Sequence, residues 1–147
     1  MSIFSSLFKK KSSGVNEITF RIPGLTYHKN AVESIMTNDK RFYLSDRDFM
    51  DKIAEGKSIY AYLYYSNACD LKHEPTNKHN RNAVMVIADG KKIGYVPDDM
   101  CQSIGQMIRK KHEASVEIHG GPRRWWENGN VFIDSRNLVA DVKLKML

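Results

Sequence analysis

The sequence predicts a small α+β domain that consists mainly of β-strands. Short runs of alternating or continuous apolar residues recur along its 147 residues, and turn signals separate them. Two or three segments with helical spacing interrupt these runs, but the regular strand–helix alternation of a parallel sheet is missing. We therefore expect a small curled or barrel-like antiparallel sheet with two or three short helices.

The first elements follow from local patterns. Alternating apolar residues in segment 17–22 predict a half-buried strand, which Pro23-Gly24 ends. Residues 28–36 fit a short helix. Ser45 is a typical N-cap, and the apolar spacing that follows predicts a helix of about ten residues that ends at Gly56.

Dense β-forming residues then predict a central strand over 59–65, covered on both faces. Two short runs, 83–87 and 92–96, flank Asp89-Gly90, a dipeptide that is typical of tight hairpins. Residues 98–108 combine an acidic start with one apolar face, and the basic residues Arg109-Lys110-Lys111 stand at the end of the segment, which together predict a helix.

The C-terminal part predicts three more strands. Val116 and Ile118 alternate with polar residues, and Gly120-Gly121-Pro122 is expected to break that strand. The apolar runs 131–133 and 138–144 are expected to form two further strands.

The charge of the chain is concentrated in two segments. Lys and Arg number 23 against 17 Asp and Glu, a net charge of +6, and segments 1–14 and 105–126 each carry +3 of it. This distribution indicates contact with nucleic acid or a lipid surface, although helix ends and tails are often basic without such a role. With 41% apolar and 27% charged residues, the chain can bury a core and is not embedded in a membrane.

Residues 1–14 are expected to be a separate leader. Apolar residues at positions 3, 4, 7 and 8 precede three lysines and Ser12-Ser13-Gly14, which has the composition of a linker. A secretory signal would place its charges first. The leader is therefore either disordered or a weak anchor that contacts a membrane surface or a partner through residues 1–11.

The cysteines predict no metal site and no cofactor. Cys69 and Cys101 lie 32 residues apart without a CxxC pattern, and no pair of histidines has ligand spacing. A disulfide between them is left open by the sequence, although a reducing, cytoplasmic compartment is favoured.

The most specific feature is a set of spaced residues between 71 and 97. It begins Leu71-Lys72-His73-Glu74-Pro75-Thr76-Asn77-Lys78-His79-Asn80-Arg81-Asn82-Ala83 and ends Gly94-Tyr95-Val96-Pro97. This pattern resembles the HIRAN domain, which occurs at the N-terminus of some DNA-repair helicases and as a standalone domain in bacteria. Segment 23–27, a glycine followed closely by an aromatic residue, also resembles that family. The resemblance covers about 16–122, within a single domain expected over 15–147 that has an atypical helical insertion at about 37–57.

The resemblance implies a fold and a binding role. The fold is a six-stranded, OB-like barrel, and the role is binding of single-stranded DNA or DNA ends, in DNA repair, replication or defence, with a helicase or nuclease as possible partner. By position, Tyr27 matches a stacking aromatic residue and Asn77 a polar contact. His79 stands where the helicase members have Tyr, Asn80 where an Asp meets the terminal hydroxyl, and Tyr95 where a His or Tyr occurs. Because Asn80 lacks a charge, the preference between 3′ and 5′ ends stays open.

The residue types indicate the same binding role independently of the family resemblance. Single strands are held by aromatic planes under the bases and basic groups along the phosphates. The candidate binding residues lie at expected strand ends or in loops, and they are Tyr27, His28, Asn77, Lys78, His79, Asn80, Arg81 and Tyr95. Alternatively, the asparagines serve only as turn residues.

A second candidate group is basic and aromatic, and it comprises Arg109, Lys110, Lys111, Arg123, Arg124, Trp125 and Trp126. Residues 123–126 are expected either to form a mobile stacking loop or to cover the end of the barrel.

Catalysis is not expected. The carboxylates available to a Mg²⁺-dependent nuclease are Asp98, Asp99, Glu117, Asp134 and Asp141, and they form no recognised motif. The sequence therefore favours a non-catalytic nucleic-acid-binding domain. The alternative is a protein-interaction or membrane-surface adaptor that binds no DNA.

Overall fold

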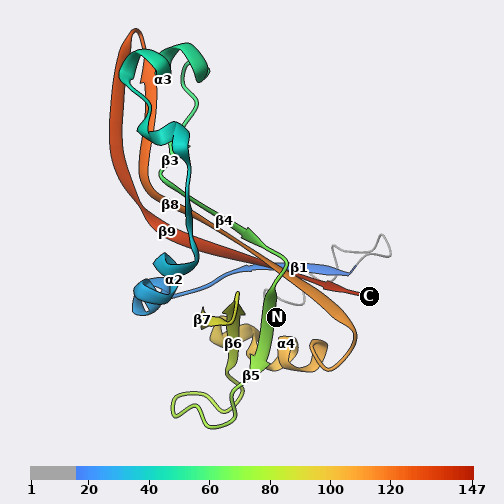
Figure 1. The fold of residues 1–147 in the computed structure, drawn as a ribbon. Helices are drawn as coiled ribbons and strands as arrows, with labels where there is room; N and C mark the ends of the chain where they lie inside the picture. Colours follow the sequence, from blue (N-terminus) through green and yellow to red (C-terminus); the bar gives the residue numbers. More distant parts are fainter. Residues whose placement is uncertain (1–15) are drawn as a thin grey trace. The chain divides into compact units, whose positions relative to one another are not determined.

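The computed structural model describes residues 16–147, so the expected leader lies outside the described residues. Within them the fold is mainly β, with antiparallel strands, three short α-helices and three short 3₁₀-helices (η) (Figure 1). In chain order the elements are β1 (Glu17–Arg21), η1 (Leu25–His28), α2 (Lys29–Ile35), β2 (Thr37–Asn38), η2 (Lys40–Tyr43), α3 (Asp46–Lys52), β3 (Ile59–Tyr60), β4 (Tyr62–Ser66), β5 (Cys69–His73), β6 (Val84–Ala88), β7 (Lys91–Tyr95), η3 (Asp98–Met100), α4 (Cys101–Met107), β8 (His112–Glu127) and β9 (Asn130–Met146).

The strands form two sheets. Six strands follow the order β1-β9-β8-β4-β2, with β3 also paired to β8, and three follow the order β5-β6-β7. Neither order returns to its first strand, so the expected six-stranded barrel is wrong. The reason is that β5, β6 and β7 pair only among themselves, while β1 and β2 remain at the edges of the larger sheet.

The chain divides into two compact units. Among the described residues, unit 1 comprises 16–35 together with Tyr65–Glu117 and Ala140–Leu147, and unit 2 comprises Met36–Tyr64 and Ile118–Val139. The strands β4, β8 and β9 contribute residues to both units. Each unit is therefore assembled from segments that are distant in the sequence.

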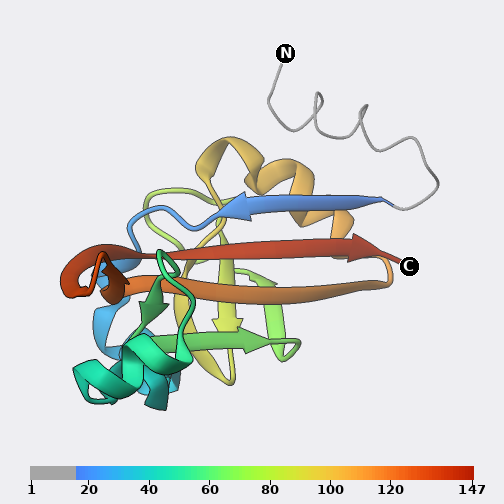
Figure 2. The ribbon, with the colours of Figure 1, turned by 90° about the horizontal axis from the view of Figure 1, so that it is seen from above.

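In unit 1, β1 pairs with the end of β9, which lies beside it in Figure 2. Ile18 lies opposite Leu144 and Phe20 opposite Val142, and all four side chains are buried, as the alternation predicts. The hairpin of β6 and β7 turns at Asp89-Gly90, which confirms that prediction. The other largest fully buried residues of this unit are Val32, Val84, Val86, Ile93, Val96, Ile104 and Val116.

In unit 2, helix α3 lies beside the hairpin of β8 and β9 (Figure 1). The hydroxyl of Ser45 accepts the backbone N–H of Asp48 at 3.2 Å, which confirms the predicted N-cap. The helix ends at Lys52, earlier than expected, because Ile53 adopts an extended conformation. Ile53, Phe49 and Ile59 form a buried core cluster in this unit, and the partly buried residues Phe42, Leu44, Trp126 and Val131 pack against it.

Three strand predictions need correction. The run 59–65 divides into β3 and β4. Leu63 and Tyr65 are exposed, so one face of β4 is uncovered, although both faces were expected to be covered. Strand β8 continues through Gly120-Gly121-Pro122, where a break was expected. The runs 131–133 and 138–144 belong to one strand, β9, and β5 was not anticipated.

Both cysteines are free and buried. Burial raises the pKa of the Cys69 thiol to about 12, with a smaller contribution from the carboxylate of Asp70. Burial also raises the pKa of Cys101. Neither thiol is therefore a reactive group at neutral pH.

Candidate functional site

Unit 1 contains an open pocket with a volume of about 510 Å³. Its wall combines the turn before η1, the loop between β5 and β6, and the segment from the end of β7 to the start of α4. The lining residues are Pro23, Gly24, Tyr27, Asn77, His79, Asn80, Ala83, Tyr95, Val96, Pro97, Asp98 and Cys101. Five of the eight principal candidate residues are thus brought together.

Tyr27 presents an exposed aromatic ring at this pocket. Its neighbour Leu25 is buried and anchors η1, whereas 89% of Tyr27 is exposed. The ring lies close to Gly24, where an added Cβ would approach Tyr27 Cδ2 to 2.9 Å. Gly24 also has a φ of 62°, which a residue without a side chain adopts readily. The turn therefore holds an aromatic plane in solvent.

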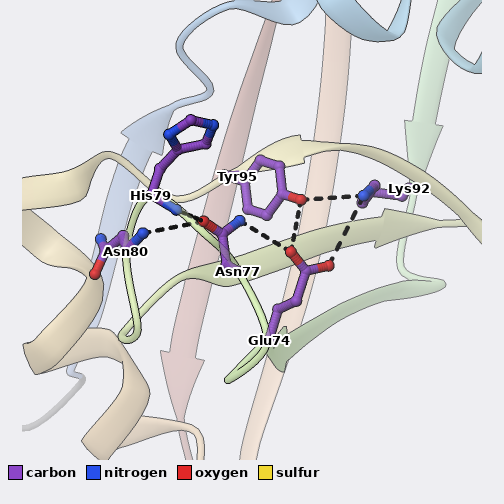
Figure 3. A network of polar contacts seen from close by, with 6 residues as sticks. All are labelled: Glu74, Asn77, His79, Asn80, Lys92 and Tyr95. Carbon is purple, nitrogen blue, oxygen red and sulfur yellow. Dashed lines mark hydrogen bonds and ion pairs between the residues drawn. The ribbon is translucent and has the colours of Figure 1, made fainter.

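The loop between β5 and β6 is ordered by its asparagines. The Asn77 side-chain oxygen accepts the backbone N–H groups of His79 at 2.9 Å and Asn80 at 3.0 Å (Figure 3). The Asn80 side-chain oxygen accepts the backbone N–H of Asn82 at 2.9 Å. Such side-chain bonds replace backbone pairing in a turn, so the loop has a defined shape without being a strand.

Glu74 connects this loop to β7. One carboxylate oxygen accepts the Asn77 amide at 2.9 Å and the Tyr95 hydroxyl at 2.8 Å (Figure 3). Lys92 donates to the Tyr95 hydroxyl at 3.0 Å and lies 3.8 Å from the other carboxylate oxygen. The hydrogen bonds from Asn77 and Tyr95, assisted by Lys92, lower the pKa of Glu74. Glu74 therefore fixes the orientation of two residues that line the pocket.

Acid is expected to remove the contribution of Glu74 to stability. Its pKa is lower in the folded state than the usual value of about 4.3, so the ionised form stabilises the fold at neutral pH, and this stabilisation is lost as pH falls through the lowered pKa. Glu74→Gln should reduce the free energy of unfolding at pH 7 by about 1–2 kcal/mol. Urea unfolding at pH 7 and near pH 3 measures this difference, which should shrink at the lower pH. A difference that is equal at both pH values would contradict the assignment.

The remaining principal candidates lie outside the pocket lining. The His28 ring centroid is 6.1 Å from that of Tyr95, and burial, together with Lys92, lowers the pKa of His28. Lys78 and Arg81 are exposed on the same loop as Asn77. The backbone carbonyl of Arg81 accepts a hydrogen bond from the ring of His73 at 2.8 Å.

The second candidate group is divided between the two units, with residues 109–111 in unit 1 and residues 123–126 in unit 2. Arg109 and Lys110 border two other pockets of unit 1, and the Lys111 carbonyl accepts the backbone N–H of Leu147. Residues 123–126 lie in β8, so of the two alternatives for this segment the mobile loop is wrong.

The four residues of that segment have separate roles. Arg124 is buried, and the Trp126 indole donates to the Ile53 carbonyl at 2.7 Å. Arg123 pairs with Asp134 at 2.6 Å. Its guanidinium also lies 4.2 Å from the ring centroid of Trp125, which stacks on Phe132.

Two residues of the site were missed by sequence reasoning. Glu74 belongs to the motif but was given no role, and Asp98 was interpreted only as a helix start or a nuclease carboxylate. The signal for Asp98 was its position directly after Gly94-Tyr95-Val96-Pro97. Among residues 16–147, no three His, Cys, Asp or Glu side chains gather in a way that could hold a metal ion.

The family model of the HIRAN domain matches residues 15–125. No curated protein and no solved structure gives a significant match. In the described part of the chain, none of the helices has the length and apolar character needed to cross a membrane.

Proposed function

Since the chain belongs to the HIRAN domain family, a family of nucleic-acid-binding domains, we propose that its unit 1 pocket binds the end of a DNA single strand without catalysing a reaction on it. The observation that carries this proposal is the exposed ring of Tyr27, which shares the pocket with Tyr95 and with the ordered loop of Asn77 and Asn80.

The aromatic residues supply the stacking that a single strand needs. Bases in a single strand stack less firmly on their neighbours than bases in a duplex, so their faces are available, and stacking on an aromatic side chain contributes about 1–3 kcal/mol per base. Tyr27 is free to offer a ring face because its backbone, and not its ring, is anchored in the fold. A base in a duplex is already stacked and offers less to such a ring.

The loop supplies polar groups in fixed positions. The amides of Asn77 and Asn80 and the imidazole of His79 line the pocket, and the hydrogen bonds within the loop hold their backbone. Amide and imidazole groups can donate and accept hydrogen bonds at base edges and sugars. Lys78 and Arg81 extend from the same loop and can contact phosphates along the rest of the strand.

Replacing Tyr27 with Ala is expected to weaken binding of a short DNA single strand by about 5- to 150-fold, which corresponds to the loss of one stacking contact. Fluorescence anisotropy with a short labelled DNA strand, and with the matching duplex, measures the change. Tyr43→Ala is the matched control, because 61% of Tyr43 is exposed but it lies in unit 2.

Equal affinity of the two variants and the wild-type protein for the strand would contradict the proposal. Affinity that is equal for strand and duplex and disappears with salt would indicate binding by charge alone. Recovery of the labelled strand intact after incubation with Mg²⁺ is expected, and its degradation would contradict the non-catalytic role.

A further inference from the structure

We propose that a second pocket of unit 1, which lies against helix α4, binds a backbone phosphate of the strand whose end occupies the pocket described above. The proposal rests on the proposed function, because it assigns a further contact to the same strand. It names a different site, which is built by other side chains. The supporting observations are polar side chains without partners, a lining without carboxylates and a wall that the two pockets share.

This second pocket, the α4 pocket, has a volume of about 370 Å³. Its wall combines His73 at the end of β5, Asn82 in the loop before β6, and one face of α4 with the turn that follows it. On that face the lining residues are spaced so that they share one side of a helix, and they are Gln102, Gly105, Gln106 and Arg109.

The α4 face is anchored and leaves room for a ligand. Ile104 and Met107 are buried and fix the helix on unit 1. At Gly105 an added Cβ would meet only the Val84 side chain, at 4.0 Å, so this face of the helix has open space. The backbone N–H of residue 109 donates to the carbonyl of residue 106 at 3.3 Å, which continues the same face beyond the end of the helix.

The polar side chains of the α4 pocket have unused hydrogen-bonding groups. Within residues 16–147, no hydrogen bond or ion pair engages four of the lining side chains, which are those of Asn82, Gln102, Gln106 and Arg109. The ring of His73, by contrast, is bound to the Arg81 carbonyl at 2.8 Å. Three amides and one guanidinium, from two segments of the chain, are thus available to a ligand.

The charge of this lining suits a phosphate. Among the described residues that line the α4 pocket, Arg109 carries the single formal charge, and there is no Asp or Glu. Lys110 and Lys111 follow it directly in the sequence. A guanidinium binds phosphate oxygens through parallel N–H donors, and amide N–H groups can donate to the same oxygens. The matching ligand is therefore an anion with several hydrogen-bond acceptors.

The position of the α4 pocket indicates that this anion belongs to the bound strand. Cys101 lines both pockets, and the loop between β5 and β6 contributes Asn80 to the first and Asn82 to the second. A strand whose end lies in the first pocket can reach the second by crossing this loop. Its backbone would then bring a phosphate to Arg109.

The first test compares Arg109→Gln with the wild-type full chain by fluorescence anisotropy with a labelled DNA single strand. The variant should bind about fivefold more weakly at low salt, and the slope of log affinity against log salt should fall by about 0.7, as expected when one phosphate contact is lost. Lys111→Gln is the matched control, because Lys111 is exposed and close in sequence but does not line the α4 pocket. It removes the same charge and should change the affinity less than about twofold.

The second test identifies the phosphate. Competitor strands of one sequence each carry a single uncharged methylphosphonate linkage, placed at successive positions from either end. At one position this linkage should weaken binding to the wild-type protein about fivefold but weaken binding to Arg109→Gln less than about twofold, because the contact is already lost in the variant. Inorganic phosphate, followed by thermal unfolding of the protein, tests for a separate anion.

Equal losses in Arg109→Gln and Lys111→Gln would overturn the proposal, since net charge alone would then explain them. A methylphosphonate penalty that is the same for the wild-type protein and Arg109→Gln at every position would also overturn it. Stabilisation by inorganic phosphate without a position-specific penalty would assign the α4 pocket to a separate phosphorylated molecule. In these cases the proposed function stands if Tyr27→Ala still weakens binding, whereas absence of binding to every strand would overturn both.

Discussion

Arg124→Met is expected to lower the free energy of unfolding of unit 2 by about 3 kcal/mol, because two carbonyl groups lose their hydrogen-bond donor. Only 5% of Arg124 is exposed, and its guanidinium donates to the carbonyls of Phe42 at 2.9 Å and Leu44 at 2.5 Å. It also pairs with Asp46 at 2.7 Å and lies 4.3 Å from the ring centroid of Phe49.

The loss should come mainly from the carbonyl groups. Asp46 is mostly exposed, so water can replace Arg124 at its carboxylate. The two carbonyls belong to the segment that covers the core of unit 2, where a methionine side chain offers no donor. A buried acceptor without a partner keeps the full cost of its desolvation.

Urea denaturation followed by tryptophan fluorescence measures this effect. The chain has two tryptophans, Trp125 and Trp126, and both lie in unit 2. Arg123→Met is the matched control, because the neighbouring Arg123 makes a partly exposed ion pair with Asp134 and should contribute far less. Equal losses of unfolding free energy in Arg124→Met and Arg123→Met would contradict the prediction that the buried contacts of Arg124 stabilise unit 2.

Gly120→Ala should destabilise unit 2 by at least about 3 kcal/mol, from backbone strain and steric overlap together. Gly120 has a φ of 109°, and an added Cβ would overlap the backbone carbonyl oxygen of Asn137. Neither partner can rotate away, because both are parts of paired strands, β8 and β9. This close approach explains how β8 continues past Gly120 where the sequence pattern indicated a break.

Gly129→Ala separates the two causes. Gly129 also has a positive φ, 74°, but no atom lies within 4 Å of its added Cβ, so only the conformational cost of about 1 kcal/mol applies. The same urea titration compares the variants. A Gly120→Ala protein that is as stable as Gly129→Ala would contradict the close approach to Asn137.

The parts of the fold that depend on neighbouring residues could be predicted from the sequence. The alternation of segment 17–22, the Ser45 N-cap and the Asp89-Gly90 turn are set within a few residues, and the structure confirms each. The pairing of β1 with β9 joins residues more than a hundred positions apart, which no local pattern specifies. Asn128-Gly129 joins β8 and β9 into one hairpin, and this dipeptide is itself typical of a tight hairpin turn, so the turn is a local feature although the length of the two strands is not.

The candidate site was predictable to a similar extent. The resemblance and the residue types identified Tyr27, Asn77 and Tyr95, which the structure places at one pocket. The positions of Glu74 and Asp98 depend on contacts between the loop after β5 and the segment around β7. Those contacts form between segments that are separate in the sequence, so the spacing of the residues does not predict them.

The assembly of the unit 2 core from two separate segments limits how related sequences can change in length. Its core residues Phe49 and Ile53 come from segment 36–64, but Trp126 and Val131, which pack on them, come from segment 118–139. A relative that lost one segment alone would expose this core to water. The two segments should therefore be gained, shortened or lost together, so that relatives with a short first segment also have a short hairpin between β8 and β9.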